Sequence, residues 1–115
     1  MVRARALHGK ILMFHGWADP NIAPQDPVEY FEAVEKRMGD VGDFYRLFMI
    51  PGMPHCSGSA DNGADFVGPD AWEASIAQLT DASNNWHLAL ERWVEKGNAP
   101  DKMIATEFDL PTSAG

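Results

Sequence analysis

Cysteine, clustered basic charge and long hydrophobic runs are all scarce in this chain of 115 residues. The single cysteine, Cys56, cannot form a disulfide within the chain, so no internal disulfide framework holds the fold together. Taken alone, Cys56 has two interpretations. It is either an inert buried thiol or one half of a disulfide with a cysteine elsewhere.

Basic charge is sparse as well as scattered. Nine Lys and Arg face seventeen Asp and Glu, which gives a formal net charge of −8. A nucleic-acid-binding chain needs a basic patch to neutralise phosphates, so we expect no nucleic acid partner. The apolar run at residues 11–14 is far too short for a membrane span or a signal-peptide core, so we expect neither within these residues. The apolar content of 45% is nevertheless ordinary for a packed globular chain.

The first half of the chain has the pattern of a strand, a helix and a second strand. Residues 10–15 (KILMFH) are nearly all apolar, as in a strand buried on both faces of a parallel sheet. Residues 27–38 alternate apolar and charged side chains at helical spacing, with Asp26 placed as the cap and Gly39 as the terminator. Residues 44–50 (FYRLFMI) predict the second strand. This order predicts a right-handed βαβ unit and an α/β fold with parallel strands and flanking helices.

The second half predicts a loop followed by helix. Residues 51–69 are rich in glycine and proline, which indicates a long loop. A helical pattern runs from Asp70 to Lys96, with a break near residues 81–85, and the tail from residue 102 adds only a short extended segment. The second part of the helical pattern presents one apolar stripe: Trp86, Leu90, Trp93 and Val94.

Three residues that can carry chemistry follow the two predicted strands: Asp19 after the first, and His55 and Cys56 after the second. Ligands bind beyond the carboxyl ends of the strands in an open parallel sheet. Because neighbouring strands lie about 4.8 Å apart, we expect the Asp19 carboxylate and the His55 imidazole to come within reach of each other. A carboxylate that holds one imidazole nitrogen lets the other act as a general base for a serine. The chain order of Asp before His also matches the α/β-hydrolases.

Each of these residues also has a structural interpretation. Asp19 precedes Pro20 and could simply start a turn, and His55 could be a surface residue of a glycine-rich loop. Their pairing at matched strand ends is what favours a site. Trp17 either lines a pocket at this edge or covers the end of the strand, and the sequence does not separate the two.

A metal site is the other chemistry to consider. His15, Asp19, His55 and Cys56 are acceptable zinc ligands by type, but their spacing is not the close spacing of structural zinc sites. We therefore expect no metal, and no cofactor.

Three blocks of the sequence, in this order, resemble the C-terminal third of the tannase and feruloyl esterase family: HGWADPNIAPQDPVEYFEAV at 15–34, FYRLFMIPGMPHCSG at 44–58 and WVEKGNAPDKMIAT at 93–106. In that family the first block resembles the loop with the triad aspartate, which falls on Asp19. The second resembles the loop with the triad histidine, which falls on His55. The cysteine after that histidine typically bridges to a cysteine beside the nucleophilic serine, and Cys56 matches its position.

The resemblance implies an α/β-hydrolase that cleaves esters of aromatic acids such as gallate or ferulate through an acyl-enzyme. It also implies a secreted or periplasmic location. The nucleophile of such an enzyme lies in a G-x-S-x-G-like elbow. None of the serines of this chain has that setting: Ser57, Ser59, Ser75, Ser83 and Ser113.

We therefore expect residues 1–115 to be the C-terminal part of one catalytic domain. The sheet is then incomplete, residues 11–14 are exposed at its open edge, and the missing partner is the remainder of the hydrolase domain. The isolated chain is expected to be inactive because it has a triad Asp and His without the serine.

Two other functions fit parts of the sequence. One is another serine acyl hydrolase or a peptidase of the same fold, although the cysteine after the histidine is not expected there. The other is a non-catalytic remnant or binding module that retains the βαβ core. A G-x-S-x-G-like elbow with an adjacent cysteine upstream would favour the esterase.

Overall fold

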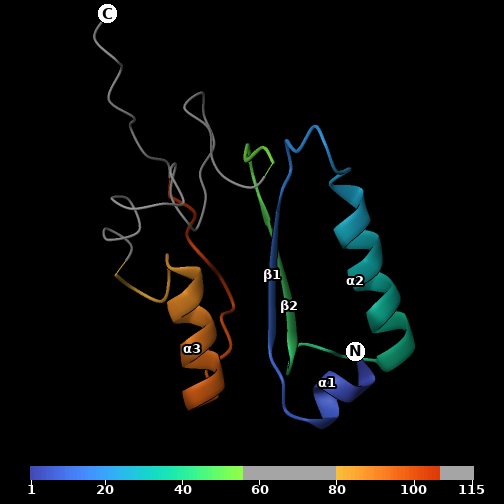
Figure 1. Cartoon of the computed structure of the whole chain (residues 1–115), viewed down its shortest axis with the longest axis vertical. Coiled ribbons are helices and arrows are strands. Elements are labelled where there is room, and N and C mark those ends of the chain that lie inside the picture. The colour runs from blue at the N-terminus through green and yellow to red at the C-terminus, as the bar shows by residue number, and fades with distance from the viewer. Residues whose placement is uncertain (56–79, 107–115) are drawn as a thin grey trace, which may run out of the picture.

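The computed structural model describes residues 1–55 and 80–106 (Figure 1). Its elements, in chain order, are α1 (Val2–Ala6), β1 (Ile11–Gly16), α2 (Gln25–Met38), β2 (Tyr45–Ile50) and α3 (Trp86–Lys96). The strands run parallel and form a two-stranded sheet in which Ile11 lies opposite Tyr45 and Gly16 opposite Ile50. In Figure 1, α2 and α3 lie on opposite sides of the sheet. The predicted βαβ unit and the incomplete parallel sheet with flanking helices are confirmed.

Both faces of β1 are covered, because its side chains alternate between two helices. Ile11 and Met13 pack in the cluster on the α2 side, whereas Leu12 packs against Trp93 of α3. Leu12 is buried and the rest of residues 11–14 are partly buried. The prediction that this run is exposed is therefore wrong, since helices cover its side chains even though β1 pairs only with β2 among the described residues.

Helix α2 begins earlier than its sequence pattern predicts. Its N-cap is Pro24, already in the right-handed helical region, and the N–H of Asp26 donates to the carbonyl of Ala23 at 3.0 Å. Asp26 thus lies in the first turn and makes no capping bond, contrary to the prediction. Pro27 is tolerated there because the first N–H groups of a helix have no partner within the helix.

Helix α3 has a cap at each end. The Asn85 side chain accepts the Leu88 N–H at 3.1 Å, and Gly97 ends the helix in the left-handed conformation with φ 71°. The turn at residues 81–84 agrees with the predicted break, while the predicted helix over residues 70–79 lies outside the described residues. Val94 was predicted to share the apolar stripe but is 61% exposed, because Trp93 already occupies the side that faces Leu12.

Helix α1 was not predicted. It has no buried residue of its own, and Arg5 ties it to the loop before β2 through a 2.8 Å ion pair with Asp43 and a 3.0 Å hydrogen bond to the carbonyl of Asp40. Within the described ranges, no helix has the length and apolar character that crossing a membrane requires.

The burial of Trp93 predicts a large stability effect. Truncating it in Trp93→Ala should lower the free energy of unfolding by about 3–5 kcal/mol, because a cavity opens against Leu12. The neighbouring Val94→Ala variant is the matched control and should change the stability by no more than about 0.5 kcal/mol. Urea unfolding followed by circular dichroism measures both. Equal losses in the two variants would contradict this packing of α3.

Candidate active site

Two loops leave the carboxyl ends of the strands, residues 17–24 after β1 and residues 51–55 after β2. Backbone hydrogen bonds join them: the Trp17 N–H donates to the carbonyl of Ile50 at 2.9 Å, and the Ala18 N–H donates to that of Met53 at 3.0 Å. The parallel pairing therefore continues past the strands, and the two loops lie side by side.

Gly16 permits this close approach. A Cβ at residue 16 would lie 2.0 Å from the carbonyl oxygen of Met53 and 2.8 Å from that of Pro54, both of them backbone atoms. The β2 loop bends with Gly52 at φ 73° directly after Pro51, a residue pair that favours a type II turn. Only glycine at residue 16 leaves room for the loop that carries His55.

The carboxylate of Asp19 lies between the two loops and accepts three hydrogen bonds from the described residues, with His15 close by. Its Oδ1 accepts the backbone N–H groups of Asn21 and Ile22 at 2.8 and 3.0 Å. Its Oδ2 lies 2.9 Å from Nδ1 of His55 and 3.3 Å from Nε2 of His15. The side chain of Asp19 is only 3% exposed, so these donors replace the water that it has lost.

These contacts decide the protonation state of Asp19. Burial by itself would raise the pKa, but the hydrogen bonds from the Ile22 N–H, from His55 and from the Asn21 N–H outweigh it and lower the pKa to about 2. Asp19 is therefore a carboxylate at neutral pH. Since a carboxylate only accepts, Nδ1 of His55 must carry the hydrogen of this bond.

The two histidines differ in their access to solvent. The side chain of His55 is 37% exposed, whereas that of His15 is 13% exposed and lies beneath the β1 loop. The structure thus brings Asp19 and His55 together as sequence reasoning expected. It also adds His15, which the sequence suggested only as a metal ligand. The sequence feature that could have indicated this contact was the spacing of four residues between His15 and Asp19.

A pocket of about 270 Å³ opens beside this cluster and is called the carboxyl-edge pocket here. Its lining comes from β1 and from both loops: Phe14, His15, Gly16, Asp19, Ile22, Met53, Pro54 and His55. Apart from the three residues of the Asp19 cluster the lining is apolar, which suits a small apolar group held next to an imidazole.

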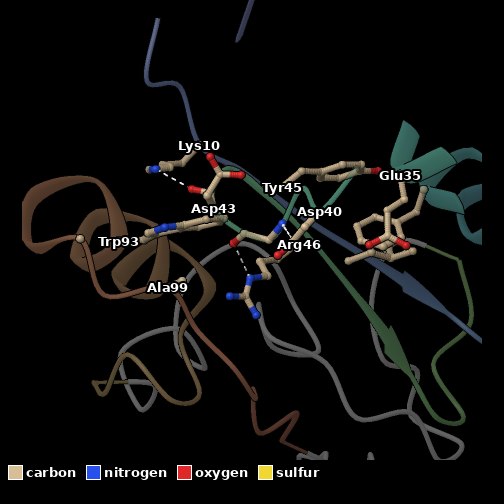
Figure 2. Close-up of a pocket in the computed structure, with 12 residues that line it drawn as sticks. Lys10, Glu35, Asp40, Asp43, Tyr45, Arg46, Trp93 and Ala99 are labelled. Carbon is tan, nitrogen blue, oxygen red and sulfur yellow. Dashed lines mark hydrogen bonds between the residues drawn. The ribbon is translucent and has the colours of Figure 1, made fainter. Parts of the chain in front are cut away.

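A larger pocket of about 860 Å³, the amino-end pocket, lies at the opposite ends of the strands (Figure 2). Its two basic side chains, Lys10 and Arg46, bind other groups of this chain. Lys10 donates to the carbonyl of Asp43 at 2.6 Å and lies 5.4 Å from the ring centre of Trp93, and Arg46 donates to the carbonyl of Gly42 at 2.9 Å. Size alone would favour this pocket, but the paired carboxylate and imidazole lie at the other end, where parallel sheets bind ligands.

The remaining predicted site residues add little. Trp17 follows β1 directly and is half-exposed, but the lining of the carboxyl-edge pocket comes from its neighbours. Cys56 lies outside the described residues. In residues 1–55 and 80–106, no group of three or more His, Cys, Asp or Glu is arranged to hold a metal ion.

Comparisons with known proteins all point to the same family. Residues 1–113 match the sequence profile described as tannase and feruloyl esterase. A probable feruloyl esterase of Arthroderma benhamiae is 42% identical over 87% of this chain and 16% of its own length. An uncharacterized esterase of Xanthomonas campestris is 31% identical over 90% of this chain and 20% of its own length. The chain therefore spans a fifth or less of these relatives.

Two solved esterase structures are similar to this chain. The crystal structure of an esterase from Aspergillus oryzae superposes with a TM-score of 0.75 at 33% identity, covering 90% of this chain and 20% of that one. Feruloyl esterase B from the same organism gives 0.68 at 28% identity, covering 87% of this chain and 20% of its own.

The close approach at Gly16 predicts an intolerant position. In Gly16→Ala, the methyl group meets backbone carbonyls that cannot rotate away, so the free energy of unfolding should fall by about 1–3 kcal/mol or more. Gly42→Ala is the matched control, since its methyl would meet only the side chains of Asp40 and Arg46. Urea unfolding measures the stabilities, and a Gly16→Ala variant as stable as Gly42→Ala would show that the loops are not this close.

The three hydrogen bonds to Asp19 predict its titration. The pKa of Asp19 lies at about 2, below its ordinary 3.8, so its contribution to stability is present above that ordinary value and is lost as the pH falls towards 2. Carboxyl carbon NMR of the 115-residue chain should give this low midpoint. His55→Ala should raise the pKa because one of the stabilising hydrogen bonds is removed. A midpoint near 3.8 in the unaltered chain would refute this hydrogen-bonded arrangement of Asp19.

Proposed function

Because the chain belongs to the tannase and feruloyl esterase family, we propose that it supplies the aspartate and the histidine of a catalytic triad that hydrolyses carboxylic esters of aromatic acids. The observation that supports this most directly is the 2.9 Å hydrogen bond from Nδ1 of His55 to Oδ2 of Asp19 at the carboxyl edge of a parallel sheet. Residues 1–115 would be the C-terminal part of one α/β-hydrolase domain. The rest of that domain would supply the serine and the oxyanion hole.

The proposed reaction uses the two nitrogens of His55 in different roles. With its hydrogen on Nδ1, the neutral ring has a free electron pair on Nε2, which takes the proton from the serine hydroxyl as the serine oxygen attacks the ester carbonyl. The Nε2 proton then passes to the leaving alcohol as the ester C–O bond breaks and the acyl-enzyme forms. In the second half, water takes the place of the serine and the acid is released.

Asp19 would act on this reaction through His55. Its negative charge stabilises the imidazolium that forms when Nε2 takes the proton, and the hydrogen bond fixes the ring in the tautomer that leaves Nε2 free. The low pKa of Asp19, about 2, supports this role because the carboxylate stays charged at any pH at which the imidazole can act as a base.

The substrate class, the location and the disulfide are further parts of the proposal. Esters of ferulate or gallate fit the family description, and relatives carry names such as probable feruloyl esterase. The whole protein would be secreted or periplasmic. Cys56, directly after His55, would bridge to a cysteine beside the serine, which would fasten the histidine loop to the nucleophile.

Activity should appear only when this chain is joined to the rest of a hydrolase domain. The purified 115-residue chain should not hydrolyse methyl ferulate or methyl gallate. A chimeric enzyme, in which residues 1–113 replace the matching segment of the Aspergillus oryzae esterase, should do so. Asp19→Asn in this chimeric enzyme should lower kcat about 10⁴-fold, and His55→Ala at least as much, because the base is misoriented or absent.

His87→Ala is the matched control, since His87 lies exposed on α3 and does not line the carboxyl-edge pocket. Folding of every chimeric variant is checked by circular dichroism. Full activity in a folded His55→Ala chimeric enzyme would refute the triad assignment. Hydrolysis by the isolated chain would place the nucleophile among its own residues.

A further inference from the structure

The structure assigns His15 as a positioning residue for Asp19, a second imidazole that holds the carboxylate which in turn holds His55. This inference rests on the proposed function for its catalytic consequence. Its structural part, the contact of His15 with Asp19 and the hydrogen bond of His15 to Ile22, stands without that function. His15 lines the carboxyl-edge pocket, but its effect on the reaction would pass through Asp19.

The surroundings of Nε2 of His15 fix its hydrogen. This nitrogen lies 3.3 Å from Oδ2 of Asp19 and 3.3 Å from the carbonyl oxygen of Ile22. Both of these atoms are acceptors, so Nε2 must carry the hydrogen. It donates this hydrogen to the Ile22 carbonyl and lies at ion-pair distance from Oδ2 of Asp19. The two histidines at Asp19 therefore have opposite tautomers when neutral: Nε2–H in His15 and Nδ1–H in His55.

His15 differs from its partners because it belongs to the sheet rather than to a loop. It lies in β1 opposite Met49 of β2, and by strand alternation its side chain shares a face with Met13, on the α2 side. A strand is a more rigid base for a positioning group than a loop. His15 therefore connects the paired strands to the loop that carries Asp19.

The backbone of Ile22 contacts both Asp19 and His15. Its N–H donates to Oδ1 of Asp19 while its carbonyl accepts from His15, and His15 also reaches Oδ2. The backbone donors of Asn21 and Ile22 belong to the same loop as Asp19, so they shape the loop but do not fix it to the sheet. Among the described residues that contact the carboxylate, His15 alone comes from a strand.

Loss of His15 should therefore loosen Asp19 relative to His55. Residues that orient a reacting group from a distance can change rates by about 100-fold when the geometry shifts by about 1 Å. We expect His15→Leu to lower kcat of the chimeric enzyme about 10–100-fold, with a smaller effect on KM, since the loss acts mainly on the orientation of Asp19. His15→Gln should recover most of this loss, because its amide N–H groups can donate to both Asp19 and Ile22.

The first measurement needs no hydrolysis and uses the 115-residue chain. In mildly alkaline buffer, where imidazole is neutral, ring ¹⁵N NMR should show His15 protonated on Nε2 and His55 protonated on Nδ1. The Nδ1–H signal of His55 should broaden or vanish in His15→Leu and persist in His15→Gln. His87→Leu, at the exposed histidine of α3, is the control and should leave that signal unchanged. An Nδ1–H tautomer of His15, or an unchanged His55 signal in His15→Leu, would overturn the inference.

The second measurement separates this inference from the proposed function. If His55→Ala abolishes hydrolysis by the chimeric enzyme but a folded His15→Leu retains full kcat, the triad stands and the positioning role of His15 is wrong. If His55→Ala retains activity, the triad itself is wrong, and the NMR result alone decides whether His15 holds Asp19. A loss in His15→Leu that His15→Gln does not recover would also contradict the positioning role, because a donor at residue 15 would then not be sufficient.

Discussion

Removing a carboxylate from water is unfavourable unless other donors take the place of the water, and the carboxyl edge of this sheet is organised around that requirement. Asp19 has a side chain that is 3% exposed. Among the described residues it accepts two hydrogen bonds from its own loop and one from the loop after β2, and His15 at the end of β1 lies 3.3 Å away. Bringing these together requires the β2 loop to pass directly over Gly16. The charge of Asp19 and the absence of a side chain at residue 16 are thus parts of one constraint.

Because of this constraint, the strands and the loops have different roles in the site. Pairing of β1 with β2 fixes where each loop begins, and the bonds from Trp17 to Ile50 and from Ala18 to Met53 extend the pairing beyond the sheet. The helices contribute by covering the two faces, which places the apolar side chains and keeps the strands in register. These backbone contacts therefore bring the loops of Asp19 and His55 together, and side-chain contacts then orient the two groups.

Much of this arrangement could be predicted because it depends on short-range patterns. Strand periodicity and the βαβ order placed Asp19 and His55 after adjacent strands, which was sufficient to bring them together. The contact of His15 could not be foreseen, since it depends on how the loop folds back over the strand. The start of α2 was misplaced because Pro24 adopts helical angles before Asp26 is reached. The predicted exposure of residues 11–14 failed because an open strand edge does not leave the side chains above and below it uncovered.

Two histidines lie near one carboxylate oxygen, and physical differences separate their roles. His55 comes from a loop, is 37% exposed and uses Nδ1, which leaves Nε2 for a group arriving from outside this chain. His15 comes from a strand, is 13% exposed and already uses Nε2 on Asp19 and Ile22. Under the proposed function, a base must both reach its substrate and return a proton to it, which would suit the more exposed ring of His55. Because the described contacts of Asp19 lie within residues 15–55, the proposed Asp–His pair would be preorganised before any nucleophile arrives.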